Sequence, residues 1–383
     1  MSVRTVVFLL VALTLLAIAL STGGAIYYLL FWMLIMMLAI ALETTLATLF
    51  TIRVTTSAQR SKAVRGETVA IRMNIRRRTV LPVGPVELEV SSPMEDRAFG
   101  RISVNLPPLR DKEYRYALNC PHRGHYPMGV SRVYVTDIFG LFSFSRAIKQ
   151  GNAMVTVVPR TETVQTMAIE PGETGPQGQV RISEDMSSPS GVRPWQDGDH
   201  MKKVHWKLTM RKRELMVRTY EESAKPDTLV LMDVGPVNAS RSHVLTIEDA
   251  MCDAAASVVL AQMTAGYPVR MPLSSKKPVE ISGQFPAEHG RFLDALTDLK
   301  FDSPYSFEQV LTLEMRRVQR TGGVILISAK MNSAIADYAV RMHRLGVQVQ
   351  MHWVAESVTP ENLTLKAQME MNGVPVRQIS PWG

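Results

Sequence analysis

The sequence predicts a multidomain protein with a membrane-spanning helical hairpin, an all-β sandwich and an α/β domain built on a parallel sheet. Three observations support this fold class. Two uncharged apolar runs lie within the first 42 residues, short alternating runs continue to residue 160, and continuous apolar runs separated by helical patterns follow residue 226. A chain of 383 residues is long enough for two soluble domains beside the apolar region.

Residues 1–50 predict a transmembrane hairpin with spans at about residues 4–20 and 25–42. Each span is long enough to cross a hydrocarbon core of about 30 Å, and in lipid each must be a helix to satisfy its backbone polar groups. The connection, Ser21–Gly24, is too short for anything but an antiparallel pair. A cleaved signal peptide is the alternative, because an apolar core followed by Ala17–Ala19 also fits that pattern. We favour the hairpin because a second span follows at once.

The distribution of charge predicts which side of the membrane holds the soluble domains. Arg4 precedes the first span, Arg53 and Arg60 follow the second, and the turn between the spans is uncharged. Residues 51–160 contain 18 lysines and arginines but only 8 aspartates and glutamates. The positive-inside rule then places both ends in the cytoplasm, in a two-pass protein of the inner (plasma) membrane. Membrane lipid is therefore an expected partner, and anionic headgroups would attract the basic region. Nucleic acid is not expected, since no recognition-helix, RRM or KH pattern is present.

Residues 51–160 predict an immunoglobulin-like β-sandwich. Apolar side chains alternate with polar ones in runs such as Val69–Arg76 and Val86–Val90, which is typical of strands with one buried and one wet face. Turn formers such as Gly84-Pro85 and Pro107-Pro108 separate the runs. Residues 161–190 are rich in Gly, Pro and Ser and predict a linker or long loop.

Residues 191–383 predict an α/β domain of Rossmann-like type. The continuous apolar runs Thr228–Met232, Gly323–Ser328 and Val347–Val354 are typical of buried parallel strands, with the last expected to be the final strand. Helical patterns at residues 247–265 and 334–345 lie between them. Helices should therefore cover both faces of a parallel sheet. Cys120 and Cys252 fall in different predicted domains and are expected to be reduced, packed thiols.

The stretch from residue 191 to 222 is unusually dense in Trp, Arg, Asp and His, and it supplies all the candidate site residues. It combines GVRPWQDGD with VHWK and LMVRTYEE. Three interpretations remain open: a structural latch, a partner-docking surface, and an active site. An active site is the weakest of the three, because no Ser or Cys nucleophile pattern accompanies the acid and the histidine. The candidates are Arg193, Trp195, Gly198, Asp199, His205, Trp206, Lys207, Arg211, Arg218 and Glu221.

These motifs, together with PHRGHY at residues 121–126 and TDIFGLF at 136–142, resemble a bacterial family called domain of unknown function 58. Lys202-Lys203 departs from the arginines common there, so a bidentate contact is not expected at that point. The resemblance implies a von Willebrand factor A-like C-terminal domain. It also implies partnership with MoxR-type AAA+ ATPases, and sometimes with transglutaminase-like membrane proteins, in complex maturation or cell-envelope processes. The family has no established catalytic activity.

Domains of the A type often hold Mg²⁺ through a D-x-S-x-S motif after the first strand. Here the corresponding residues are Asp233, Gly235 and Val237, so both serines are missing. Lys330, shortly after the strand Gly323–Ser328, supplies a cation where an acid would favour a metal. No metal and no cofactor are therefore expected, and Asp233 should instead cap nearby backbone groups.

The sequence thus predicts a non-enzymatic, membrane-anchored adaptor or scaffold protein that works with a MoxR-type AAA+ ATPase. The alternative is an envelope-related hydrolase centred on Asp199 and His205.

Overall fold

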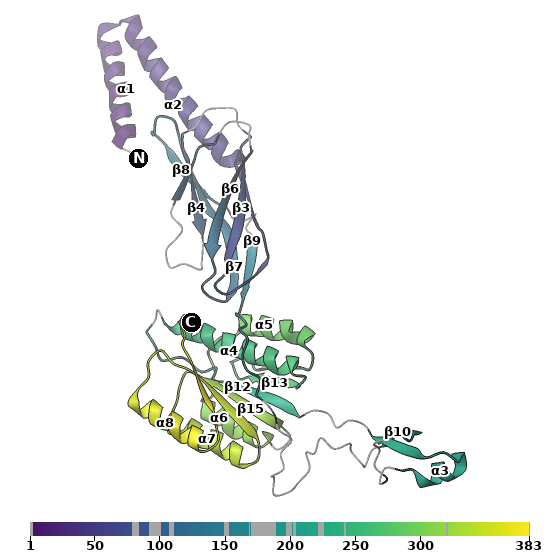
Figure 1. Cartoon of the computed structure of the whole chain (residues 1–383). Coiled ribbons are helices and arrows are strands. Elements are labelled where there is room, and N and C mark those ends of the chain that lie inside the picture. The colour runs from purple at the N-terminus through teal and green to yellow at the C-terminus, as the bar shows by residue number, and fades with distance from the viewer. Residues whose placement is uncertain are drawn as a thin grey trace. The chain divides into compact units, whose positions relative to one another are not determined.

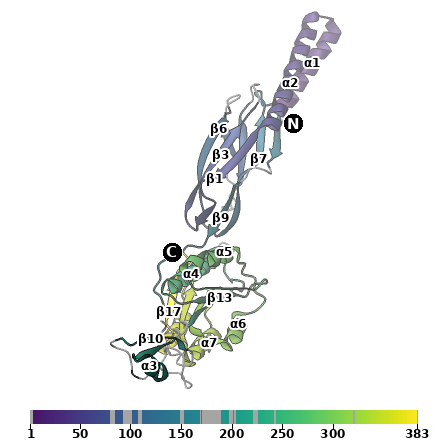
Figure 2. The ribbon, with the colours of Figure 1, turned by 90° about the vertical axis from the view of Figure 1, so that its right-hand side faces the viewer.

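The computed structural model describes residues 3–78, 84–91, 101–106, 111–148, 153–167, 169, 189–196, 201, 204–220, 226–240, 243–318 and 321–382. The chain divides into two compact units, Met1–Val158 and Pro159–Gly383. Both are drawn in Figures 1 and 2.

Two apolar helices begin the first unit, α1 (Val3–Thr22) and α2 (Ala25–Thr51). Gly23, with a φ of 64°, makes the turn between them at no steric cost. Both helices are long and apolar enough to cross a membrane, which is compatible with the expected two-pass protein.

Helix α2 continues beyond the predicted span to Thr51, and its last turns belong to the β domain. Thr44, Thr45 and Thr48 are buried there. The hydroxyls of Thr44 and Thr45 each donate a hydrogen bond to the carbonyl of Ala41. Leu49 joins the hydrophobic core of the strands that follow. The transition from helix to strands is therefore a packed joint.

Two sheets form the rest of the first unit. Val69, Ile71, Met73 and Ile75 are buried and alternate with more exposed neighbours, as the period of two predicted. Side chains from both sheets meet in shared cores, so the sheets pack face to face. One sheet has the order β1 (Arg53–Ala58), β3 (Thr68–Arg76), β6 (Asp111–Asn119); the other has β2 (Lys62–Val64), β9 (Ala153–Val158), β7 (Gly124–Thr136), β4 (Val86–Ser91), β5 (Arg101–Val104), with β8 (Ser143–Ala147) also paired to β7.

A six-stranded sheet organises the second unit. Its order is β14 (Val279–Gly283), β13 (Val269–Leu273), β12 (Asp227–Met232), β15 (Thr321–Ser328), β16 (Gln348–Val354), β17 (Val376–Ile379), and all strands are parallel except β14. The expectation that residues 347–354 form the final strand is wrong, because β17 follows. Only its first residue is buried, so its four residues give no continuous apolar run.

Helices cover both faces of this sheet, as predicted. One core contains α4 (Val244–Thr264) and α5 (His289–Asp298), which follows the short helix η2 (Pro286–Glu288). The other contains α6 (Phe307–Met315), α7 (Ser333–Arg344) and α8 (Pro360–Met371). From β12 the chain crosses to β13 on one side and later to β15 on the other. In open α/β sheets the crevice beside such a reversal, at the carboxyl ends of the strands, is the usual ligand site.

The beginning of the predicted linker at residues 161–190, as far as Met167, lies along α4. The backbone N–H of Arg160 donates to the Asp253 carboxylate at 2.8 Å, and that of Glu162 donates to the Ser257 hydroxyl at 2.9 Å. Gln262 in turn donates to the carbonyl of Met167 at 3.3 Å. Residues 159–167 are therefore an extended strap fixed to the α/β unit.

Residues 189–220 form a separate structure, here called the hairpin module. It comprises β10 (Pro189–Pro194), α3 (Trp206–Lys212) and β11 (Met216–Tyr220). β10 and β11 pair with each other in an antiparallel ladder, and Val217 of β11 also forms an antiparallel bridge with Val204. The predicted domain 191–383 therefore begins with a hairpin outside its six-stranded sheet.

Candidate functional site

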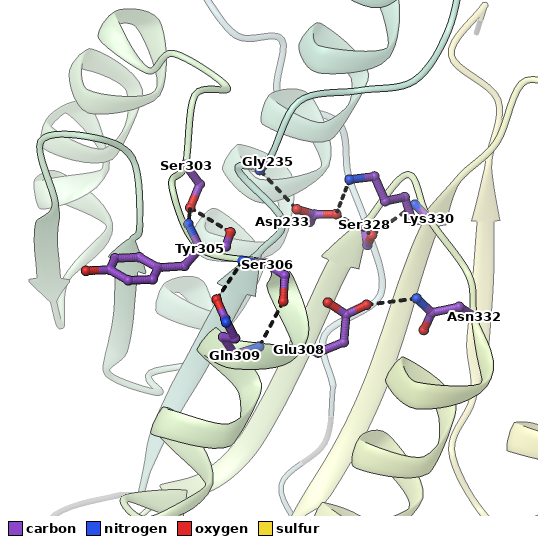
Figure 3. Close-up of polar contacts among 10 residues, drawn as sticks. All are labelled: Asp233, Gly235, Ser303, Tyr305, Ser306, Glu308, Gln309, Ser328, Lys330 and Asn332. Atoms are coloured by element: carbon purple, nitrogen blue, oxygen red, sulfur yellow. Dashed lines mark hydrogen bonds and ion pairs between the residues drawn. The ribbon is translucent and has the colours of Figure 1, made fainter.

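Polar side chains gather where β12 and β15 end, beside the reversal in strand order (Figure 3). Asp233 comes directly after β12, and Ser328 is the last residue of β15. We call this group the strand-end cluster; its members are Asp233, Glu308, Ser328, Lys330 and Asn332.

Asp233 is the centre of the cluster and is almost fully buried. Its Oδ1 accepts the N–H of Gly235 at 3.0 Å, which confirms the expected capping role. Its Oδ2 accepts the Ser328 hydroxyl at 3.2 Å and lies 3.9 Å from the Lys330 ammonium. The carboxylate is therefore stabilised by two hydrogen bonds and a nearby cation, as a buried charge requires.

Gly235 suits this position because of the close approach of Asp233. A β-carbon on residue 235 would lie 3.0 Å from Asp233 Oδ1 and 3.7 Å from Lys330 Nζ. The backbone of the loop after β12 therefore lies directly against the Asp233 carboxylate, at the position where a D-x-S-x-S loop would have a serine hydroxyl. Lys330 Nζ supplies the positive charge at this carboxylate, and its side chain is 44% exposed.

A second pair lies beside Asp233 in Figure 3. Glu308 Oε1 accepts the side-chain N–H of Asn332 at 2.8 Å. This hydrogen bond, with a smaller contribution from the charge of Lys330, holds the pKa of Glu308 below its usual value. Asn332 also caps α7 by accepting the N–H of Ile335, while Ser306 and Gln309 form a capping box at α6. Most polar groups here already have partners within the protein.

One more pair at this edge lies outside the sequence motifs. His243, just before α4, lies 2.5 Å from the carboxylate of Glu356, and its ring meets Trp382 edge to face at a centroid distance of 4.8 Å. Glu356 follows β16, so the rule that polar side chains collect after parallel strands could have found it. His243 and Trp382 lie in no recognisable pattern. Among the described residues no three His, Cys, Asp or Glu side chains converge on a metal-sized site.

The hairpin module contains the residues that the sequence singled out. Gly198, Asp199 and Glu221 lie outside the described residues. The others occupy the three elements of the module: Arg193 in β10, Trp195 just after it, His205 before α3, Trp206, Lys207 and Arg211 in α3, and Arg218 in β11.

Local hydrogen bonds and a small core hold the module together. The N–H of Trp195 donates to Leu215, and that of His205 donates to Met216, each at 2.8 Å. Met216 and Val217 are buried, with Val204 against them. His205 Nδ1 accepts the N–H of Leu208 at 3.2 Å and so caps α3. These contacts lie within the module, so the interpretation of the motif as a latch that fixes the loop onto the sheet stays a prediction.

The outer surface of α3 is different. Trp206 is 57% exposed and Met210, one turn later, is 81% exposed. The other exposed side chains of this helix and its cap are cationic: Lys207, Arg211, Lys212 and Arg213. Large exposed apolar side chains rimmed by charges are typical of protein interaction surfaces.

Comparison with known proteins supports one family. Residues 191–359 match the family described as "Protein of unknown function DUF58", so the resemblance seen in the motifs is confirmed for this part of the chain. The match covers the hairpin module from Gly191 onward and the strands of the sheet along the chain as far as β16. No curated protein matches the chain.

Solved structures give only distant similarities. The crystal structure of a CARDB domain from Pyrococcus furiosus, in complex with di-metal ions, is 13% identical over 28% of this chain and 87% of its own, with a TM-score of 0.20. The solution structure of that domain is 11% identical over 28% of this chain and 94% of its own, also at 0.20. A β-glucosidase from Erythrobacter marinus is 15% identical over 28% of this chain and 15% of its own, at 0.19. Scores this low support no argument about function.

Proposed function

We propose that this chain is a membrane-anchored adaptor with a von Willebrand factor A-like domain, whose hairpin module docks a cytoplasmic partner. The partner we propose is a MoxR-type AAA+ ATPase, the class implied by the family resemblance. The strand order, with an antiparallel edge strand and a polar cluster at the reversal, supports the proposed domain type. Helices α1 and α2 would anchor the protein as a two-pass hairpin with both units in the cytoplasm.

One observation carries the docking proposal: Trp206 and Met210 stand exposed on one side of α3 among cationic side chains. Exposing a tryptophan and a methionine contributes nothing to folding, because the gain from apolar burial is not realised. Trp and Arg are the residue types that most often dominate interface energetics. The cations favour a partner with an acidic surface, since complementary charge accelerates association and guides its orientation.

The strand-end cluster supports a non-catalytic interpretation of the α/β domain. The Asp233 carboxylate is already occupied by Gly235, Ser328 and Lys330, and Glu308 binds Asn332. A general base needs a lone pair directed at substrate. The lone pairs of the Asp233 and Glu308 carboxylates are directed at groups of the protein itself. The cluster is therefore better suited to fixing the conformation of the loops at this edge than to catalysis.

The docking proposal can be tested with the full-length protein in lipid nanodiscs and the MoxR-type ATPase of the same organism. Trp206→Ala and Met210→Ala should each weaken binding, and the loss for Trp206 should be at least tenfold, as expected for an interface hot spot. Trp382→Ala and Met371→Ala remove side chains of similar exposure elsewhere and are the matched controls. Equal affinity for all five proteins would contradict the proposed docking surface.

The same assay separates the adaptor from the alternative hydrolase. Asn is a good helix cap but cannot transfer protons as histidine does. His205→Asn should therefore preserve α3 and partner binding. Loss of an envelope-hydrolysing activity in this variant, with binding unchanged, would favour the enzyme.

A further inference from the structure

A groove lies between the two apolar helices and one turn of the β domain. The turn joins β7 to β8 and spans residues 137–142. The cavity has a volume of about 440 Å³, within the about 300–1,000 Å³ of typical ligand sites. Apart from one arginine its lining is apolar: Arg4, Val7, Phe8, Val11, Leu34, Met37, Phe139 and Leu141.

The turn has a defined conformation. The buried Asp137 carboxylate accepts the N–H of Phe139 at 2.9 Å and that of Phe142 at 2.6 Å. Gly140 supplies the left-handed residue, with a φ of 70°. A side-chain carboxylate that accepts backbone N–H groups of its own loop fixes the conformation of that loop.

The turn is also tied to the beginning of α1. The hydroxyl of Thr5, itself buried, donates to the carbonyl of Leu141 at 2.5 Å. This bond sets the turn level with the first turn of α1. If α1 enters the membrane there, as the proposed function requires, the turn lies at the depth of the lipid headgroups.

Two apolar side chains at the tip of the turn fit that depth. Ile138 is 55% exposed and Phe139 is 47% exposed. Apolar and aromatic side chains at the interface insert into the boundary between headgroups and acyl chains.

Arg4 lies at this same point. A β-carbon on Gly140 would be only 2.9 Å from a guanidinium nitrogen of Arg4, so the cation rests against the turn. The guanidinium suits a phosphate group because it presents several N–H donors in one plane. If the headgroup of an acidic lipid lay at Arg4, its acyl chain would extend along the apolar lining formed by α1 and α2.

We infer that this groove binds one anionic phospholipid, with its phosphate on Arg4 and an acyl chain along Val7, Val11 and Met37. The inference rests on the proposed membrane anchor. A phospholipid matches the site because it combines one negative headgroup with an apolar chain, as the groove combines one cation with an apolar wall. The lipid would join the hairpin to the β domain and hold that domain at a set distance from the bilayer.

Native mass spectrometry of the detergent-purified, full-length protein tests the inference. Titration with phosphatidylglycerol should show one preferred binding event, tighter than with phosphatidylcholine of the same chains. Arg4→Gln should weaken that event about fivefold, the effect of one well-placed cation. Val11→Trp should abolish it by filling the groove.

Matched variants separate the groove from general effects. Arg53→Gln removes an exposed membrane-proximal arginine that follows α2, and Val6→Trp adds the same bulk to α1 outside the groove lining. Both should bind the lipid as the wild type does. Circular dichroism checks that each variant is folded; if Val11→Trp is not, the comparison of Arg4→Gln with Arg53→Gln is sufficient.

The inference would be overturned by equal affinity for the two lipids, or by lipid binding unchanged in both Arg4→Gln and Val11→Trp. Displacement by glycerol 3-phosphate alone would also overturn it, because the ligand would then be a soluble phosphate. Alkaline carbonate extraction tests the membrane anchor separately. Release of the protein would defeat the proposed anchor, whereas a retained protein without lipid preference would defeat only this inference.

Discussion

The strand-end cluster and the hairpin module differ in whether their prominent side chains are buried beside partners or exposed on the surface. In the cluster, Asp233 is buried and each of its oxygens has a partner within the protein. In the module, Trp206 and the cations of α3 face outward, and the fold beneath them consists of a few buried side chains and one short ladder. The cluster is positioned by two large cores, the module by its own local contacts.

This difference indicates which region is structural and which is available for contact. Groups that already satisfy one another contribute to the conformation of a loop and have little left for a ligand. Exposed apolar side chains among charged neighbours contribute to stability only when another surface covers them and removes them from water. Asp233 at the edge of the sheet is therefore the structural element, and α3 of the hairpin module is the proposed contact element.

Asp233→Ala should have the largest effect on stability. If it had none, the contrast between a structural cluster and an exposed contact surface would fail. The change leaves the Gly235 N–H and the Ser328 hydroxyl without their acceptor, so local stability should fall by about 2–3 kcal/mol. Hydrogen exchange in the full chain should show faster exchange in β12 and β15 and no change in the hairpin module. Asp337→Ala, on the exposed side of α7, is the control. Unchanged exchange in the sheet would mean that the cluster is not structural.

His352 gives the next effect, through pH. Burial, with a smaller contribution from Arg377, lowers its pKa to about 4. The unfolded chain takes up a proton near pH 6.5 while the folded chain does not, so this stability is present above that pH and is lost as pH falls toward 4. Stability of the α/β unit should be about 2 kcal/mol lower at pH 5 than at pH 8. Burial also lowers the pKa of His289, which acts in the same direction.

Thermal unfolding of the wild type and of His352→Leu at pH 8 and pH 5 measures this effect. The variant should lose most of the pH dependence, since leucine cannot be protonated. An identical pH dependence in both proteins would assign the effect to other groups. The protection of the hairpin module against hydrogen exchange, taken relative to the intrinsic exchange rate at each pH, should not fall in this way, which sharpens the contrast between the two regions.

Much of this architecture could be predicted from sequence, because its periodicities are strong. The apolar runs gave α1 and α2, alternation gave strands such as β3, and the apolar runs ending at Met232 and Ser328 gave the central strands. The missed strand, β17, is short and mostly exposed, so it lacks the pattern of a buried strand. The extension of α2 to Thr51 was missed because its threonines are polar by type yet buried by packing.

The site was less predictable, since side-chain pairing across the sheet edge depends on tertiary packing. The capping role of Asp233 followed from local spacing, but its contacts with Ser328 and Lys330 join residues far apart in the chain. His243 with Glu356 is a similar case. The motif at residues 191–222 was found at once by its composition. Composition could not show which of its tryptophans would be half-buried and which exposed.

The smallest effect should come from Arg213 and concerns the module alone. Arg213 ends α3 in the left-handed conformation, at a φ of 61°, where glycine is the favoured residue. Arg213→Gly should therefore stabilise the module by about 0.5 kcal/mol, measured as slower hydrogen exchange at Met216 and Val217. Arg213→Ala keeps the β-carbon and removes the charge, so it should give no such gain. If alanine stabilised the module as much as glycine, repulsion among Lys207, Arg211, Lys212 and Arg213 would be the larger cost. The module would then be limited by charge crowding, which a partner with an acidic surface would relieve.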